Sequence, residues 1–256
     1  MRVLPGAKSK SILQKFQSAL GLKSSFIEGP KELVESQPSF IETLVERYCI
    51  GKGLEIGPGK TPYGPKNRTI SLDKHTSNKD ATPRPDMVAD ASDIPIRDAQ
   101  FDFLISSHCL EHVPNTLLTL REWARVIRSG GTLFLILPHG DRTLDRYRAK
   151  TTLEHHIRDL ERVGKAKSDP SHFDEMKNGW LMNPGFEEQK DLYEKEWGGE
   201  VWNFDFRVKN DVLHYHVWTS SQMVEIIKYL GFEILYAADY FEERPDSFVV
   251  VSRKPS

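Results

Sequence analysis

The sequence predicts an α/β fold whose centre is a mostly parallel, seven-stranded sheet with helices on both faces. Short apolar runs with little alternation recur along the 256 residues, which is typical of strands buried on both faces. Three of the first runs carry an acidic residue at or near their end, and glycines close the helical patterns between runs. The runs predicted as strands are residues 54–56, 68–73, 86–90, 101–107, 132–137, 232–238 and 248–252.

Three helical patterns accompany these strands. One spans residues 39–48 and leads into the first strand. Asn115 is placed to begin the second, which Gly130 and Gly131 would end, and Thr219 is placed to begin the third. The short polar link at residues 242–246 joins the last two predicted strands and predicts one antiparallel edge strand.

Residues 140–213 interrupt this succession of strand and helix patterns, because they are polar and charged and contain no strong strand pattern. They predict a helical insertion after the fifth strand, placed as a cap over the carboxyl edge of the sheet. The chain then divides into four parts: an N-terminal helical cover at 1–49, a core at 50–139, the insertion at 140–213, and a final helix and two strands at 214–256. Within the first part, residues 8–20 form a basic amphipathic pattern that would cover the body of the protein or lie on a membrane surface.

Composition excludes several classes of function. The net charge is −2, which argues against nucleic-acid binding through a basic surface. No apolar run approaches the roughly 20 residues of a membrane span, so stable membrane insertion is not expected. The two cysteines, Cys49 and Cys109, provide no disulfide framework, and a cytoplasmic location is therefore predicted.

A glycine loop directly after the first predicted strand marks a ligand site. Gly57-Pro58-Gly59 follows the apolar run that contains Glu55, and ligands of open α/β sheets bind just beyond such strand ends. The third glycine of the dinucleotide fingerprint is replaced by Pro62, which weakens a nicotinamide reading.

Acids recur at the ends of the first three strands: Glu55, Asp73 and Asp90. A carboxylate accepts hydrogen bonds and suits a pair of ribose hydroxyls or an ammonium group. Phosphate instead requires N–H donors and cations. The pattern therefore predicts a nucleoside ligand that carries an amino group.

In these features the chain resembles the class I S-adenosylmethionine-dependent methyltransferases, which have a Rossmann-like fold. The stretches that carry the resemblance are residues 54–59, 71–73, 89–95, 101–113 and 126–133. It covers roughly residues 50–138, with weaker support from 217–252.

The resemblance implies a role for each motif residue. Glu55, Gly57 and Gly59 would surround the methionine part of S-adenosyl-L-methionine. Asp73 would bind the ribose hydroxyls. Asp90 and the backbone of Ala91 would contact the adenine edge. Ser106 and His108 would flank the methionine part or the sulfonium.

Histidines are concentrated outside the cofactor motifs and are the candidates for catalysis. His214 and His216 flank Tyr215 on an extended stretch, so both are expected on one face. His155 is spaced four residues from Asp159, which suits a metal site or a base held by a carboxylate. His139, just after the fifth strand, is the further candidate.

These features predict methyl transfer to a small-molecule or glycan-like acceptor, at a hydroxyl that a histidine deprotonates. Two or three histidines could instead hold a divalent metal that lowers the pKa of the acceptor. A binding or regulatory module of the same fold, or a metal-dependent enzyme of different chemistry, remains the alternative function.

Overall fold

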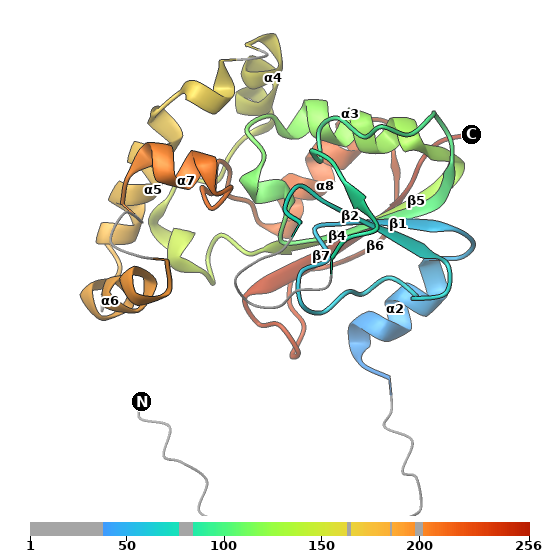
Figure 1. Cartoon of the computed structure of the whole chain (residues 1–256), viewed down its shortest axis with the longest axis horizontal. Helices are drawn as coiled ribbons and strands as arrows, with labels where there is room; N and C mark the ends of the chain where they lie inside the picture. Colours follow the sequence, from blue (N-terminus) through green and yellow to red (C-terminus); the bar gives the residue numbers. More distant parts are fainter. Residues whose placement is uncertain (1–37, 77–83, 163–164, 185, 198–201) are drawn as a thin grey trace, which may run out of the picture. The chain divides into compact units, whose positions relative to one another are not determined.

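The computed structural model describes residues 38–76, 84–162, 165–184, 186–197 and 202–256. Its centre is a seven-stranded sheet of order β3-β2-β1-β4-β5-β7-β6 (Figure 1). The predicted helix at residues 8–20 and most of the predicted N-terminal cover lie outside the described residues. The strands are β1 (Gly53–Ile56), β2 (Thr69–Asp73), β3 (Met87–Val88), β4 (Phe101–Ser107), β5 (Ile127–Pro138), β6 (Glu233–Ala238) and β7 (Ser247–Arg253).

The central strands are buried on both faces, which explains their unbroken apolar sequence. Leu54 of β1 pairs in register with Leu104 of β4, and both contribute to one hydrophobic cluster. The neighbouring Phe103 and Ile105 belong to the cluster on the opposite face. Because side chains alternate across a strand, a sheet covered on both sides needs apolar residues at every position.

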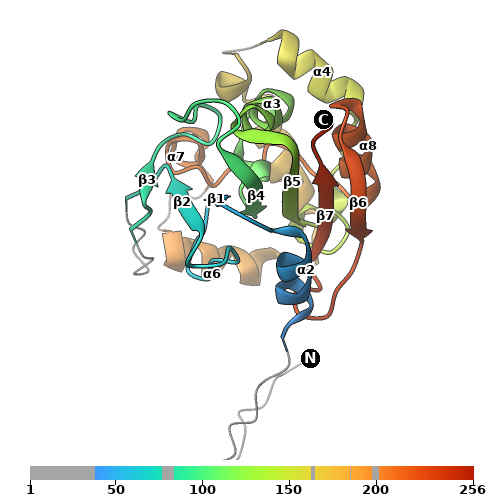
Figure 2. The same cartoon turned by 90° about the vertical axis from the view of Figure 1, so that its right-hand side faces the viewer.

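Helices supply both covers. Helix α2 (Phe40–Tyr48) packs on one face and begins at Ser39, which forms a capping box with Glu42. Helices α3 (Thr116–Val126) and α8 (Ser220–Tyr229) pack on the other face. Figure 1 shows α3 and α2 on opposite sides of the sheet, and Figure 2 shows the same layers turned by a quarter revolution. The predicted α/β fold with helices on both faces is confirmed.

Two sequence predictions about the elements were wrong. One antiparallel edge strand was expected, but the strand that runs against all the others is β7, which lies in the interior between β5 and β6; the edge strand β6 pairs antiparallel with it. Its residues are almost all buried, which suits an interior strand, whereas β6 is partly exposed at the edge. Helix α3 also ends at Val126, and Gly130 and Gly131 instead lie within β5.

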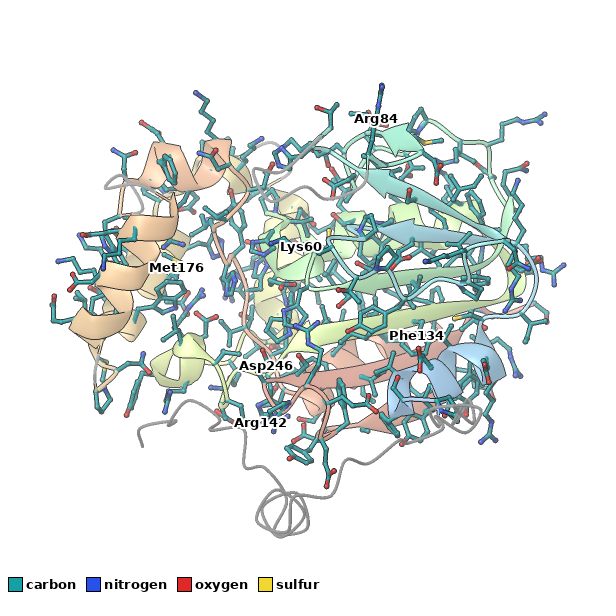
Figure 3. All side chains as sticks on the ribbon, turned by 60° about the horizontal axis from the view of Figure 1, so that its bottom comes forward. Lys60, Arg84, Phe134, Arg142, Met176 and Asp246 are labelled. Atoms are coloured by element: carbon teal, nitrogen blue, oxygen red, sulfur yellow. The ribbon has the colours of Figure 1, made fainter. Side chains whose placement is uncertain are left out.

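The segment after β5 is helical. It contains η2 (Leu144–Tyr147), α4 (Leu153–Glu161), η3 (Ala166–Ser168), α5 (Ser171–Leu181), α6 (Phe186–Trp197) and α7 (Phe204–Lys209). These helices have a core of their own, which includes Met176 and Trp180. Figure 3 shows Met176 among these helices and Phe134 on the sheet beside α2. Within the described residues, no helix is both long enough and apolar enough to cross a membrane.

Candidate functional site

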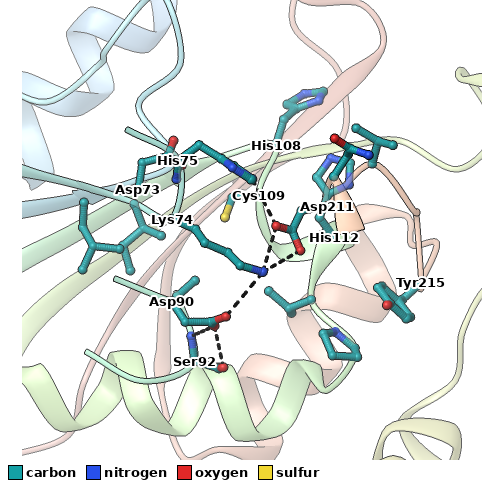
Figure 4. Close-up of a pocket in the computed structure, with 18 of the residues that line it drawn as sticks. Asp73, Lys74, His75, Asp90, Ser92, His108, Cys109, His112, Asp211 and Tyr215 are labelled. Carbon is teal, nitrogen blue, oxygen red and sulfur yellow. Dashed lines mark hydrogen bonds and ion pairs between the residues drawn. The ribbon is translucent and has the colours of Figure 1, made fainter. Parts of the chain in front are cut away.

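A pocket of about 570 Å³ lies at the carboxyl ends of β1, β2 and β4 (Figure 4). The last part of the insertion, from Phe206 to Val212, contributes to its wall. Six of the eight residues predicted to bind a cofactor line this pocket: Gly57, Gly59, Asp73, Asp90, Ala91 and His108.

The loop after β1 needs glycine. Gly57 and Gly59 have φ angles of +67° and +56°, in the left-handed region that other residues rarely adopt. A Cβ at Gly57 would also lie 3.0 Å from the Cβ of Cys109. The two glycines therefore let the backbone turn tightly and form the pocket wall without side chains.

Asp73 ends β2, and one of its two carboxylate oxygens can still accept a hydrogen bond. Its Oδ1 accepts a hydrogen bond from the His75 backbone N–H at 2.9 Å. For Oδ2 there is no hydrogen-bond partner in the described part of the chain. An acidic oxygen at the pocket wall is thus available to a ligand hydroxyl.

Asp90 lies after β3 and is held in the ionised form. Its Oδ1 accepts hydrogen bonds from the backbone N–H and the hydroxyl of Ser92, at 2.9 and 2.7 Å. Burial raises the pKa of Asp90, but these bonds and the positive charge of Lys74 outweigh it, so the net pKa is lowered.

An ion pair joins the end of β2 to the insertion across this pocket. The Lys74 ammonium lies 2.8 Å from Oδ2 of Asp211 and 3.8 Å from Oδ2 of Asp90, as the dashed lines of Figure 4 show. His75 Nε2 is a further 3.1 Å neighbour of Asp211. The segment at Asp211 is therefore fixed over the pocket by two basic side chains of the core.

Glu55 and Ser106 do not line the pocket, and this corrects the role expected for their side chains. The Glu55 carboxylate is buried and accepts hydrogen bonds from the backbone N–H groups of Tyr63 and Gly64, at 2.8 and 3.0 Å. The buried hydroxyl of Ser106 donates to the carbonyl oxygen of Ile56 at 3.1 Å. Both residues hold the glycine loop and its strand in place.

His108 lies where β4 leaves the sheet, with a φ of +49° that is unusual for a residue with a side chain. Its Nε2 is 2.8 Å from the hydroxyl of Ser247. Burial lowers the pKa of His108 to about 3, so the ring is neutral near pH 7.

A second pocket, of about 450 Å³, also borders the glycine loop. It shares Gly57, Gly59 and His108 with the first pocket, and Tyr63 and Arg244 contribute to its wall. The glycine loop and His108 therefore border both pockets.

Beyond His108, the loop carries two titratable side chains next to the first pocket. Glu111 is fully buried, and burial raises its pKa to about 7. His112 lines the pocket, and its Nδ1 lies 3.2 Å from the carbonyl oxygen of Leu213. The loop is thereby attached to the end of the insertion.

His214 adjoins this loop and is oriented by a carboxylate. Its ring centroid is 4.9 Å from that of His112, and its Nδ1 donates to Oδ2 of Asp145 at 2.6 Å. Asp145 also accepts from Arg148 Nη1 at 3.0 Å and from Trp180 Nε1 at 2.8 Å. Burial raises the pKa of Asp145, but these three partners outweigh it and hold its pKa well below the usual range.

The structure separates the remaining predicted histidines from His214. His216 Nε2 lies 3.0 Å from Oδ2 of Asp159, and His155 Nε2 lies 3.2 Å from the same oxygen. His139 Nε2 is 3.1 Å from Asp239 Oδ1. His214 and His216, which were expected on one face, contact different carboxylates, Asp145 and Asp159.

Sequence reasoning missed several residues at the pocket. Lys74 directly follows the acid that ends β2, so its position alone could have indicated it. Asp145, Asp211 and Tyr215 gave no local signal, because they reach the site only through the folding of the insertion.

Comparison with known proteins identifies one domain model. A methyltransferase-domain family model matches residues 65–135. Ajmaline N-methyltransferase of Rauvolfia serpentina is 44% identical over 57 residues, which are 22% of this chain and 19% of that protein. An uncharacterised protein of Methanocaldococcus jannaschii is 33% identical over 101 residues, 38% of this chain and 49% of that protein. The chain thus spans about half or less of the length of these curated relatives.

Solved structures with a similar arrangement are methyltransferases of low sequence identity. A S-adenosylmethionine-dependent methyltransferase of Thermotoga maritima has a TM-score of 0.46 and 14% identity, over 84% of this chain and 87% of that chain. One from Mesorhizobium loti has a TM-score of 0.45 and 15% identity, over 84% and 98%.

Proposed function

We propose that the chain, which matches a methyltransferase-domain model over residues 65–135, is a class I S-adenosylmethionine-dependent methyltransferase. In this proposal it transfers the methyl group to a hydroxyl of a small-molecule or glycan-like acceptor. His214, held by Asp145, is the general base in this proposal. The observation that carries it is the 2.6 Å hydrogen bond between these residues, next to a histidine that lines the pocket.

The pocket residues fit the cofactor. Asp73 offers a carboxylate oxygen for the ribose hydroxyls, and Asp90 with the Ala91 backbone offers acceptors and a donor for the adenine edge. Gly57 and Gly59 leave room for the methionine part. When bound, S-adenosylmethionine supplies a methyl group already activated by a positively charged sulfur, so the protein mainly aligns the acceptor and removes its proton.

His214 is suited to remove that proton. With the Nδ1 hydrogen donated to Asp145, the neutral ring carries its lone pair on Nε2, which has no hydrogen-bond partner within the described ranges. The negative charge of Asp145 stabilises the imidazolium that forms on proton uptake, as in other histidine–carboxylate pairs. His214 therefore takes the proton and Asp145 fixes the tautomer.

His155, His216 and His139 were the other candidates for catalysis. None of the four histidines lines the pocket and each pairs with a carboxylate, so we favour His214 on the position of its ring. The His214 ring lies 4.9 Å from that of the pocket residue His112, whereas the His216 ring lies 6.4 Å from that of the pocket residue Tyr215.

We infer the class of the methyl acceptor from the net charge of the chain and from the side chains of the pocket wall. A net charge of −2 does not favour a polyanion such as nucleic acid. The wall facing the insertion contains Tyr215, Phe206 and Pro114, which suit a compact organic molecule or a sugar ring. We also place the reaction in the cytoplasm, because Cys49 and Cys109 are both free thiols.

The test is a screen for transfer of a labelled methyl group. The purified chain is incubated with labelled S-adenosylmethionine and pools of sugars, hydroxylated metabolites and, as a comparison, amines. Transfer to a hydroxyl compound supports the proposal, and transfer only to amines would reassign the acceptor atom. Tight binding of S-adenosylhomocysteine by calorimetry without transfer to any pool would instead favour a binding or regulatory module.

A further inference from the structure

A group of four metal-ligating side chains lies outside the cofactor pocket. His155 and Asp159 come from α4, His172 comes from α5, and His216 comes from the extended segment before α8. One ligand atom of each lies within 4.8 Å of the corresponding atoms of the other three. Side chains from three separate segments therefore converge on one point.

The distances resemble those of a coordination shell. The Nε2 atoms of His155 and His216 lie 3.2 and 3.0 Å from one oxygen of Asp159, Oδ2. Ligand atoms bound at about 2.0–2.2 Å around tetrahedral zinc are roughly 3.3–3.5 Å apart. The three atoms thus need only small shifts to form edges of such a tetrahedron.

The three imidazole rings surround that carboxylate oxygen. The ring centroids of His155, His172 and His216 are 5.1 to 5.5 Å apart in each pair. His172 and His216 are buried, and Asp159 is nearly so. Three of the four polar side chains have been taken out of water here, and His155 is partly exposed. Burial of polar side chains is costly unless all their polar atoms find partners.

Hydrogen bonding does not satisfy this cluster. His155 Nε2 is buried, and although it is close to Asp159, its geometry gives no hydrogen bond within the part of the chain that the structure describes. A buried ring nitrogen directed at a carboxylate and two further imidazoles is explained by a shared cation.

Residues outside the group orient its members. The hydroxyl of Thr116 lies 3.1 Å from His216 Nδ1, which directs Nε2 toward Asp159. The side-chain amide of Asn115 donates to the backbone carbonyl of Asp159 at 2.8 Å. A histidine whose second nitrogen is hydrogen-bonded in this way is typical of metal sites.

We propose that His155, Asp159, His172 and His216 bind one zinc ion. Three imidazoles and one carboxylate match the nitrogen and oxygen ligands that zinc prefers, and four protein ligands complete a tetrahedron. The site is structural because no coordination position is left for a substrate.

The ion would join α4 and α5 of the insertion to the segment that leads back into the sheet. Tyr215, next to His216, lines the cofactor pocket, and its ring centroid is 5.7 Å from that of His172. Zinc bound here therefore fixes the acceptor side of that pocket without contacting the reacting atoms.

Metal analysis of the full chain tests the proposal. The protein is purified without a metal-affinity tag, and its zinc content is measured by mass spectrometry before and after dialysis against a chelator. We expect about one zinc per chain and a clear fall in the melting temperature after chelation, which added zinc reverses. Replacement by Co²⁺ should give the visible absorption bands of a tetrahedral site.

Two variants locate the ion. His172→Gln should lower the zinc content well below one per chain, whereas His139→Gln, which removes a histidine with its own carboxylate partner elsewhere, should retain it. If the first variant does not fold, the chelation and refilling of the unmodified chain still decide. A zinc content near zero that added zinc does not raise, or equal zinc in both variants, would overturn the proposal.

Discussion

The hydrogen bond from His214 to Asp145, at 2.6 Å, joins the segment before α8 to η2 near the mouth of the pocket. Asp145 is almost fully buried and is itself held by Arg148 and Trp180. A rigid carboxylate of this kind keeps the imidazole in one orientation and one tautomer. The general-base role that we propose for His214 rests on this pair.

Removing the imidazole should abolish most of the turnover but not cofactor binding. We expect His214→Gln to lower kcat by about a hundredfold or more, because general-base catalysis typically contributes this much. The affinity for S-adenosylhomocysteine should stay nearly unchanged, since His214 does not line the pocket. Initial rates with an acceptor found by the screen and calorimetry on the same preparation measure both quantities.

Asp145→Asn serves as the companion variant. It keeps the shape and a partner for Arg148 but removes the charge that stabilises a protonated His214. It should lower kcat less than His214→Gln does, because the imidazole remains and only its charged partner is lost. Full activity in His214→Gln would rule out this base.

The cofactor side of the site could be predicted from the sequence because its residues lie at the ends of strands, next to recognisable strand patterns. Gly57, Gly59, Asp73 and Asp90 occupy the ends of consecutive strands, and parallel strands bring their carboxyl ends to one edge. The continuous apolar runs likewise predicted the strands of the sheet. The same reasoning did not hold for the Glu55 side chain, because its carboxylate accepts hydrogen bonds from backbone N–H groups of the loop that follows β1.

The arrangement of the histidines and their carboxylate partners depends on contacts between segments far apart in the sequence. His214 and His216 are two residues apart, yet their partners Asp145 and Asp159 come from different insertion elements. Alternation along an extended segment predicts a common face only where the chain is a regular strand, and these residues are in none. His172 likewise reaches the proposed zinc group only through the packing of α5.

Asp73 should contribute directly to cofactor affinity. Asp73→Ala removes a charged acceptor from the ribose hydroxyls and should weaken binding of S-adenosylhomocysteine by about 1–3 kcal/mol. Asp86→Ala is the matched control: this acid bonds Ser71 of the same strand but does not line the pocket. Equal affinity in the folded Asp73 variant and the unmodified chain would remove this residue from the ribose site.

The pocket should distinguish between two kinds of nucleotide ligand. A third glycine is absent from the loop, where Pro62 stands, and acids rather than cations end β2 and β3. S-adenosylhomocysteine should therefore raise the melting temperature, and NAD at the same concentration should have little effect. Thermal unfolding with each ligand measures this, and the opposite order would contradict the assigned cofactor.

Glu111 should make folding stability depend on pH in a defined direction. Burial raises its pKa from 4.5 to about 7, so between these values the folded chain holds a proton that the unfolded chain has released. The free energy of unfolding should then fall as pH rises through this window, and Glu111→Gln, which resembles the protonated form, should escape that loss. Relative to the unmodified chain, the variant should gain on the order of 2–3 kcal/mol between about pH 4.5 and about pH 8. Urea denaturation of both proteins at the two pH values gives this difference, in which the buried histidines shared by both chains largely cancel. A difference that is constant with pH, or that favours the unmodified chain at high pH, would show that Glu111 is ionised in the folded protein.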